Sequence, residues 1–212
     1  MIQYHKIAVI GGTGKAGKYL VKNLLAQGFQ IKILLRHPEN FKIINPLIEV
    51  IKGDARDLTA IRILLEDCSA IISAVGQPKG EPSVFSQVSK NITEVMNEYG
   101  IKRYILLTGL NVDTPFDQKN EIVKQGTAWM YANYPLITAD KQLEYEALVN
   151  SNIDWTLVRL PLIELTDKSY GVNINLKDCP GEKISATDLS YFLINQLYDQ
   201  TYIKQAPFIA SI

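Results

Sequence analysis

The stretch IAVIGGTGKAGKYLVKNLLAQG, Ile7–Gly28, decides the fold of this chain. Its apolar run Ile7–Ile10 predicts a buried strand, and the helical spacing of the apolar residues further on predicts a helix that ends at Gly28. The turn between them carries three glycines, which are Gly11, Gly14 and Gly17. Glycine permits a tight turn and a close approach of a ligand to backbone N–H groups, and the N-terminus of the next helix attracts phosphate. This unit therefore predicts a site for the pyrophosphate of a dinucleotide.

The same turn supplies further candidate phosphate contacts. Thr13 and Lys15 offer side-chain donors, and Ala16 lies beside the expected start of the helix. The spacing is GxxGxxG rather than the GxGxxG fingerprint, so a plain tight loop is the alternative interpretation. A second expected strand at Phe29–Arg36 completes a short βαβ unit, and this context favours the dinucleotide site.

Strands and helices alternate along nearly the whole chain. Further strands are expected within LIEVIKGD, ending near Gly53, and at Ala70–Gly76, Lys102–Gly109, Asp154–Leu160 and Tyr170–Leu176. Helices are expected from Asp57 through Leu65, over Ser83–Tyr99, over residues 119–150 with a break near Asn133–Pro135, and from Ser185 or Thr187 through Leu197. Because the strands are apolar on both faces, we expect one α/β domain over residues 1–212, a Rossmann-type doubly wound parallel sheet flanked by helices, with a very small C-terminal elaboration.

Composition narrows the class of function. Lys plus Arg and Asp plus Glu both number 22, so the net charge is zero, and no basic run suggests nucleic acid. The two cysteines, Cys68 and Cys179, and the two histidines, His5 and His37, stand far apart, so no metal site is expected. No apolar run has the length of a membrane span, and no secretory signal is visible at the N-terminus. We therefore expect a cytoplasmic protein with a small-molecule partner, and both monomer and homodimer stay open.

The end of the second expected strand bears on the choice of dinucleotide. NAD sites usually place an acidic residue there, against the ribose 2′-hydroxyl, whereas this chain reads ILLRHPEN and places Arg36 there. A guanidinium is suited to the 2′-phosphate of NADP(H), so NADP(H) is expected, with NAD(H) as the alternative. An ordinary exposed arginine at a strand end is the competing interpretation of Arg36.

Taken together, GGTGKAG, LLRHPEN, IKGDARD, ISAVG, YILLTG and DWTLVRLP resemble the atypical branch of the short-chain dehydrogenase/reductase superfamily over nearly the whole chain. Within that branch the chain looks most like the NmrA-like and biliverdin-IXβ/flavin reductase group, which binds NADP(H). The resemblance implies that Asp54 and Ala55 lie beside the adenine. It also implies cofactor contacts on the adenosine ribose and pyrophosphate side and around the nicotinamide, from Ala74, Val75, Gly76, Thr108, Pro161, Leu162 and Ile163.

The chain departs from the family in its catalytic residues. Typical members use Ser, Tyr and Lys, with the last two as Tyr-x-x-x-Lys, and no lysine here follows a tyrosine by four positions. Lys141 stands where the family lysine falls, but position 137 is Ile137, and Gly109 stands at the serine position after Thr108. Lys141 and Thr108 are thus the candidate catalytic residues, and Lys141 is also a candidate cofactor ribose contact. Tyr131 or Tyr145 is the alternative acid.

Two functions follow from this pattern. The first is NADPH-dependent reduction of a small planar acceptor, such as a flavin, quinone or tetrapyrrole, which can take its proton from solvent. An apolar acceptor pocket would then be lined by Leu110, Trp129, Tyr131 and their neighbours Met130, Tyr134, Leu162 and Ile163. The second is a non-enzymatic NADP(H)-binding redox sensor of the NmrA-like type, which the missing tyrosine and serine favour. An epimerase or dehydratase is disfavoured, because those relatives carry Tyr-x-x-x-Lys.

Overall fold

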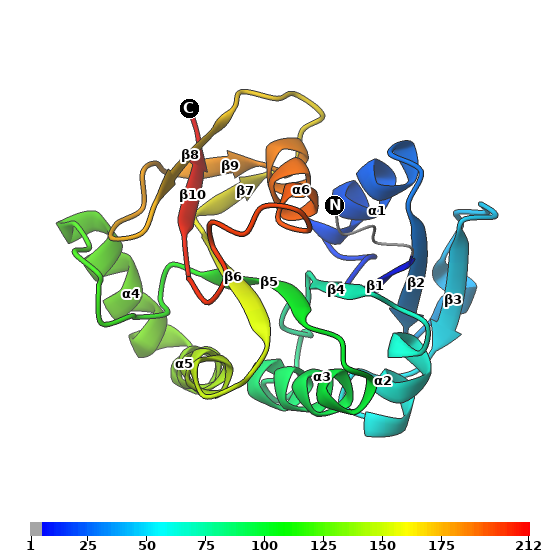
Figure 1. Cartoon of the computed structure of the whole chain (residues 1–212). Coiled ribbons are helices and arrows are strands. Elements are labelled where there is room, and N and C mark those ends of the chain that lie inside the picture. Colours follow the sequence, from blue (N-terminus) through cyan, green and yellow to red (C-terminus); the bar gives the residue numbers. More distant parts are fainter. Residues whose placement is uncertain (1–5) are drawn as a thin grey trace.

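A computed structural model describes residues 6–212 as an α/β protein built on one large sheet (Figure 1). The strands of that sheet are β1 (Lys6–Ile10), β2 (Gln30–Leu35), β3 (Ile48–Lys52), β4 (Ala70–Ser73), β5 (Arg103–Gly109), β6 (Asp154–Leu160), β8 (Val172–Asn175) and β10 (Phe208–Ser211). The helices are α1 (Gly17–Ala26), α2 (Leu58–Leu65), α3 (Phe85–Tyr99), α4 (Glu121–Asn133), α5 (Pro135–Val149) and α6 (Ala186–Asn195), with a 3₁₀ turn η1 (Pro38–Asn40). Two short strands, β7 (Leu162–Glu164) and β9 (Lys183–Ser185), pair in parallel outside the main sheet.

The order of strands across the main sheet is β3-β2-β1-β4-β5-β6-β10-β8. The pairs from β3 to β10 are parallel, and β8 runs antiparallel to β10 at the edge. The chain moves outward from β1 to β3 and then returns to place β4 on the other side of β1. The strand order reverses between β1 and β4, and in open α/β sheets such a reversal opens a ligand crevice at the carboxyl ends of the strands.

Helices cover both faces of the sheet. Figure 1 shows α1 and α6 together on one face and α2, α3 and α5 on the other. Each layer has its own apolar core, which includes Leu20, Leu24 and Leu193 on the first face and Leu64, Ile92 and Leu148 on the second. The predicted doubly wound Rossmann-type α/β fold is confirmed.

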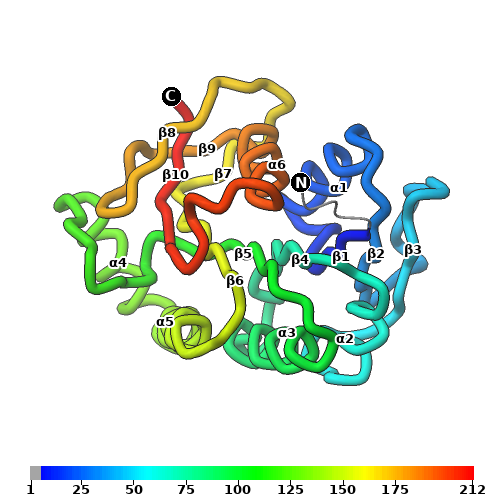
Figure 2. The backbone as a smooth tube through the Cα atoms, viewed as in Figure 1, coloured from blue at the N-terminus to red at the C-terminus, as the bar shows by residue number. Residues whose placement is uncertain are grey.

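The C-terminal third differs in detail from the expectation. The predicted strand at Tyr170–Leu176 is present as β8, but it lies antiparallel on the sheet edge rather than in a parallel position. The position beside β6 is taken by β10 from the end of the chain, as the tube in Figure 2 makes clear. The sequence analysis predicted neither β10 nor the three-residue strands β7 and β9, because such short segments show no readable alternation.

The helical region 119–150 divides as predicted. α4 ends at Asn133 and α5 begins at Pro135, so Tyr134 is the junction between them. Proline favours the first position of a helix and cannot continue the preceding one, which explains the break. Only Val123 of α4 is buried, so this helix lies at the side of the molecule rather than over the sheet.

Candidate functional site

A cavity of about 1360 Å³ opens at the carboxyl ends of β1, β2, β4, β5 and β6, where the strand order reverses. Most of the predicted cofactor residues line it. These are Gly11, Thr13, Gly14, Lys15, Ala16, Arg36, Asp54, Ala55, Ala74, Val75, Gly76, Thr108, Lys141, Pro161 and Ile163. The fold therefore gathers into one cavity residues that stand up to 152 positions apart in the sequence (163 minus 11).

The glycine turn near the middle of the cavity, between β2 and β4, is held by close backbone contacts. Gly11 has φ +74, and a Cβ placed there would lie 2.4 Å from the carbonyl oxygen of Ala74. A Cβ at Gly17 would lie 2.0 Å from the carbonyl oxygen of Gly11. Both positions exclude any larger residue, so these glycines bring β1, β4 and α1 together. Gly17 itself does not line the cavity, and its place is inside the turn.

The N-terminus of α1 faces the same turn, where the N–H groups of Lys18 and Tyr19 donate to the carbonyl oxygens of Gly14 and Ala16. No side chain caps it, and no acidic residue lies in its first turn. The first N–H groups of a helix lack helical partners and carry a partial positive charge. Lys15 and Lys18 also line the cavity, so this end is suited to a pyrophosphate group.

The far end of the cavity, at β2 and β3, carries charged side chains. Arg36 lines the cavity and donates to Glu81 at 2.6 Å between Nη1 and Oε1. Asp54, which the family resemblance places beside adenine, accepts from Arg56 at 3.0 Å and 2.6 Å. Arg56 was not singled out from the sequence, although the IKGDARD motif places it two residues after Asp54.

Thr108 and Lys141 both line the opposite end of the cavity, together with Pro161 and Ile163. Thr108 is 5% exposed, and its Oγ1 has no hydrogen-bond partner among residues 6–212. Lys141 Nζ lies 4.8 Å from the centre of the Phe85 ring, and burial lowers the pKa of Lys141. A buried hydroxyl without a partner is costly, so Thr108 has an unused hydrogen-bonding capacity at the cavity wall.

Gly109 explains why the family serine is absent. A Cβ at this position would lie 2.5 Å from Oδ1 of Asn111 and 3.5 Å from Nζ of Lys141. Asn111 is 2% exposed, so its side chain already fills the space that a serine would need. Glycine at position 109 thus leaves room for the Asn111 side chain.

Several predicted residues do not line the cavity, Gly17, Met130 and Tyr134 among them. Leu162 is 79% exposed, because Ile163 points inward and neighbouring side chains in a strand point to opposite faces. Leu110 packs instead against a small cluster of Val123, Cys179 and Phe208. Trp129 and Tyr131 lie on the exposed helix α4, where the Trp129 ring packs edge-on against Tyr134 at 5.7 Å.

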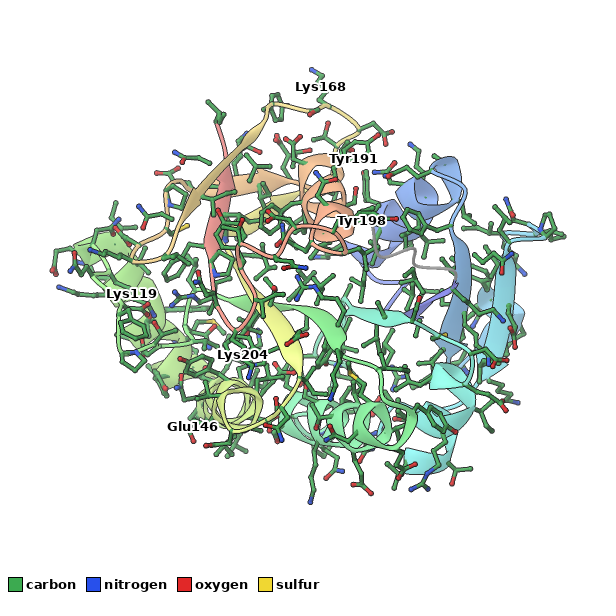
Figure 3. All side chains as sticks on the ribbon, viewed as in Figure 1. Lys119, Glu146, Lys168, Tyr191, Tyr198 and Lys204 are labelled. Atoms are coloured by element: carbon green, nitrogen blue, oxygen red, sulfur yellow. The ribbon has the colours of Figure 1, made fainter. Side chains whose placement is uncertain are left out.

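The expected aromatic acceptor pocket is therefore not formed by these residues. The segment between β5 and α4 leads away from the cavity, and Figure 3 labels Lys119 of that segment beside α4, on the side opposite β2 and β3. The apolar wall at the Lys141 end is aliphatic instead, with Val84, Val88, Leu107 and Leu160. Tyr145, one alternative acid, packs edge-on against Trp155 at 6.0 Å and does not line the cavity.

A buried carboxyl group lies behind Lys141 on α5. Glu144 is 4% exposed and accepts from Ser89 Oγ at 2.5 Å, and Ser89 in turn meets the Tyr104 hydroxyl at 2.9 Å. Burial raises the pKa of Glu144 to about 7. No described residue partners its second oxygen, so protonation removes a costly buried charge.

Glu144 makes the stability of the protein depend on pH. Between its usual pKa of 4.5 and about 7, the unfolded chain has released a proton that the folded protein keeps. Raising the pH through this window therefore favours unfolding, by about 3 kcal/mol in total. We expect Glu144→Gln to remove this contribution to the pH dependence of the free energy of unfolding. Urea unfolding at several pH values between 4.5 and 8 measures it.

The matched control for that experiment is Glu146→Gln on the same helix. Glu146 is exposed, and Figure 3 shows it on the outer side of α5. Its replacement should leave the pH slope within about 0.5 kcal/mol of the wild type over the same window. The same pH dependence of the unfolding free energy in the wild type and in Glu144→Gln would contradict the assignment of this dependence to Glu144.

Comparison with known proteins agrees with this site. The sequence model of the NAD(P)H-binding family matches residues 11–200, and the chain belongs to that family. A short-chain dehydrogenase/reductase from Veillonella parvula in complex with NADP shares the fold, with a TM-score of 0.80, 14% identity, and coverage of 99% of this chain and 95% of that one. The oxidoreductase YlbE from Lactococcus lactis superposes with a TM-score of 0.79 at 17% identity, over 98% and 91% of the two chains. The predicted membership of an NAD(P)H-binding family is thereby confirmed.

The curated relatives are longer than this chain. An uncharacterized chloroplastic protein of Arabidopsis thaliana is 24% identical over 74% of this chain and 59% of its own length. The mouse decarboxylating sterol-4-alpha-carboxylate 3-dehydrogenase is 26% identical over 69% of this chain and 41% of its own length. The chain thus spans less than two thirds of these relatives, which are dehydrogenase- or reductase-like where their names state an activity.

Within residues 6–212 no helix is both long and apolar enough to cross a membrane. The same stretch of chain brings together no group of three or more His, Cys, Asp or Glu residues that would suit a metal ion. His5, which the sequence analysis considered, lies outside the described residues.

Proposed function

We propose that this protein is an NADPH-dependent reductase of a small planar acceptor, such as a flavin, quinone or tetrapyrrole. One observation carries the proposal: a single cavity extends from β2 and β3, past a helix N-terminus without a side-chain cap, to Thr108 and Lys141 at its other end. Its volume of about 1360 Å³ exceeds the roughly 300–1,000 Å³ of pockets for one drug-sized ligand. A dinucleotide and an acceptor are expected to fill it together.

The residues present fit this cofactor. The turn at Gly11–Gly17 with Lys15 would hold the pyrophosphate, Arg36 the 2′-phosphate, and Lys141 the nicotinamide ribose. When bound, NADPH supplies the hydride. Thr108 would donate to a polar atom of the cofactor or acceptor, and the aliphatic wall at Val84, Val88 and Leu160 would exclude water. Since no tyrosine among residues 6–212 lines the cavity, the proposed acceptor is one that takes its proton from solvent.

The setting proposed for this activity follows from the cysteines. Cys68 and Cys179 are both free and buried, as is common in a reducing compartment such as the cytoplasm. The proposed partner is the small-molecule acceptor, with no nucleic acid or membrane involved. The chain acts as a monomer or a homodimer in this proposal.

The test is NADPH oxidation by the purified protein in the presence of FMN, biliverdin and simple quinones, with NADPH binding followed by fluorescence in the same samples. Turnover above the protein-free rate would support the reductase. Tight binding without turnover of any acceptor would favour the redox sensor instead. Absence of NADPH binding would contradict the cofactor assignment.

Preference for NADPH over NADH is expected to depend on Arg36. Removing its charge in Arg36→Gln should weaken NADPH binding about 10- to 100-fold, the usual effect of losing charge-assisted hydrogen bonds. NADH binding should change less than about threefold, because NADH has no 2′-phosphate. Arg62→Gln is the matched control, since Arg62 pairs with Glu98 at a similar exposure of 40% but does not line the cavity. Equal losses for both cofactors would refute the role of Arg36.

A further inference from the structure

Three charged side chains from three separate segments meet at the β2–β3 end of the cavity. Arg36 directly follows β2, Arg56 follows β3, and Glu81 lies in the loop between β4 and α3. The Glu81 carboxylate bridges the two guanidinium groups, at 2.6 Å to Nη1 of Arg36 and 3.0 Å to Nη1 of Arg56. Arg36 and Arg56 both line the cavity, whereas Glu81 does not.

Asp54 holds Arg56 in this position. Its two carboxylate oxygens accept from Nε and Nη2 of Arg56 at 3.0 Å and 2.6 Å, and one of them also accepts from the Arg56 backbone N–H at 2.9 Å. A two-point pair of this kind fixes the plane of the guanidinium group. The remaining Nη1 is left for Glu81, so the second arginine is oriented before any ligand arrives.

The two guanidinium groups resemble an anion-binding site that the Glu81 carboxylate already occupies. Two guanidinium groups repel each other, and a shared carboxylate offsets this repulsion. The Arg36 guanidinium also holds the pKa of the Glu81 carboxyl below its usual range, so Glu81 is charged at neutral pH. A phosphate group has the same bidentate geometry toward guanidinium as a carboxylate, with one more acceptor oxygen.

We propose that Arg56 is a second ligand of the adenosine 2′-phosphate, and that Glu81 occupies the two-arginine site until NADP(H) displaces it. This inference rests on the proposed NADP(H) function and deepens it. The position favours the 2′-phosphate over the pyrophosphate, because Arg36 ends β2, where dinucleotide folds read the ribose 2′ position. The pyrophosphate would lie at the glycine turn on α1.

Displacement of the Glu81 side chain by a phosphate group costs little free energy. The side chains of Arg36, Arg56 and Glu81 are 44%, 40% and 33% exposed. Ion pairs at such exposure add little stability, because water and salt screen them. The 2′-phosphate brings a larger charge than a carboxylate and displaces it, whereas the 2′-hydroxyl of NAD(H) does not. Glu81 therefore sets how strongly the site prefers NADP(H).

The experiment is calorimetric titration of the wild type, Arg56→Gln and Glu81→Gln with NADP⁺, NAD⁺ and 2′,5′-ADP. Arg56→Gln should weaken NADP⁺ and 2′,5′-ADP about tenfold and leave NAD⁺ within about threefold. Glu81→Gln should strengthen NADP⁺ and 2′,5′-ADP about three- to fivefold, because the competing carboxylate is gone. Arg62→Gln removes an equally exposed arginine away from the cavity. It should leave the affinities for NADP⁺, NAD⁺ and 2′,5′-ADP unchanged.

The outcomes separate this inference from the function on which it rests. If the wild type binds NADP⁺, Arg36→Gln weakens it, and neither Arg56→Gln nor Glu81→Gln changes it, the inference is overturned and the cofactor assignment stands. If the wild type binds neither NADP⁺ nor 2′,5′-ADP, both this inference and the cofactor assignment are wrong. A weaker rather than stronger affinity in Glu81→Gln would also overturn the inference, since Glu81 would then support the site instead of competing for it.

Discussion

Replacing Gly17 with alanine is expected to weaken NADP(H) binding at least about thirtyfold and to lower the free energy of unfolding by about 2 kcal/mol. The added methyl group would lie 2.0 Å from the Gly11 carbonyl oxygen and 2.7 Å from the Cα of Gly12. Both neighbours are backbone atoms, so no side-chain rotation relieves the overlap. The start of α1 must then move away from the turn, which misplaces the N–H groups that would meet the pyrophosphate. NADPH fluorescence titration and urea unfolding measure the two effects.

Substitutions at two other glycines distinguish an effect on stability from an effect on cofactor binding. Gly14→Ala adds a methyl group to the cavity wall only 3.2 Å from the Gly11 carbonyl oxygen, so its main effect should be on binding. Gly126→Ala lies in helix α4 with no atom within 4 Å of the new methyl group. It should stabilise the protein by about 0.5–1 kcal/mol and leave binding unchanged. Wild-type binding by Gly17→Ala would contradict the role of the turn.

The second large effect is expected from Asp117→Ala, which should lower the free energy of unfolding by about 3–5 kcal/mol. Arg159 is 0% exposed, and its Nη1 donates to both carboxylate oxygens of Asp117, at 2.8 Å and 2.7 Å. The same guanidinium lies 3.5 Å from the centre of the Phe208 ring. Removing Asp117 leaves a buried charge without its counter-ion, which is far more costly than losing an exposed pair.

Asp113→Ala is the matched control for this prediction. Asp113 accepts from Lys119 at 2.5 Å, but its side chain is 54% exposed, against 9% for Asp117. Lys119 also keeps two backbone acceptors, the carbonyl oxygens of Leu110 and Val112. Asp113→Ala should therefore cost less than about 1 kcal/mol by urea unfolding. Equal losses in the two variants would show that burial does not govern this cluster.

Much of the fold could be predicted, because its information is local. The run Ile7–Ile10, the glycines after it and the helical spacing up to Gly28 each reflect contacts within one βαβ unit. The break near Pro135 is likewise a local backbone property. β10 was different, because it joins the sheet only through pairing with β6 and β8 from earlier in the chain. A four-residue strand shows no periodicity that would reveal such pairing.

Some residues of the candidate site could likewise be predicted from local sequence, and others could not. Residues at the carboxyl ends of strands, such as Arg36 and Thr108, could be predicted because parallel strands end at one edge of the sheet. Trp129 and Tyr131 could not be placed, because the course of the chain after β5 depends on the buried cluster of Arg159, Asp117 and Lys119. Those contacts carry α4 away from the cavity, so an aromatic run that suggested a pocket wall lies on the surface.

The sequence by itself determined the doubly wound α/β fold, the glycine turn and the dinucleotide family, since each depends on periodicity or on a motif within a few residues. Only the tertiary structure decided that Glu81 bridges Arg36 and Arg56, that Asn111 fills the serine position, and that Glu144 is buried behind Lys141. These features arise where segments distant in sequence come within hydrogen-bond distance or bury a charge. Such proximity is a property of packing, and packing leaves no local pattern in the chain.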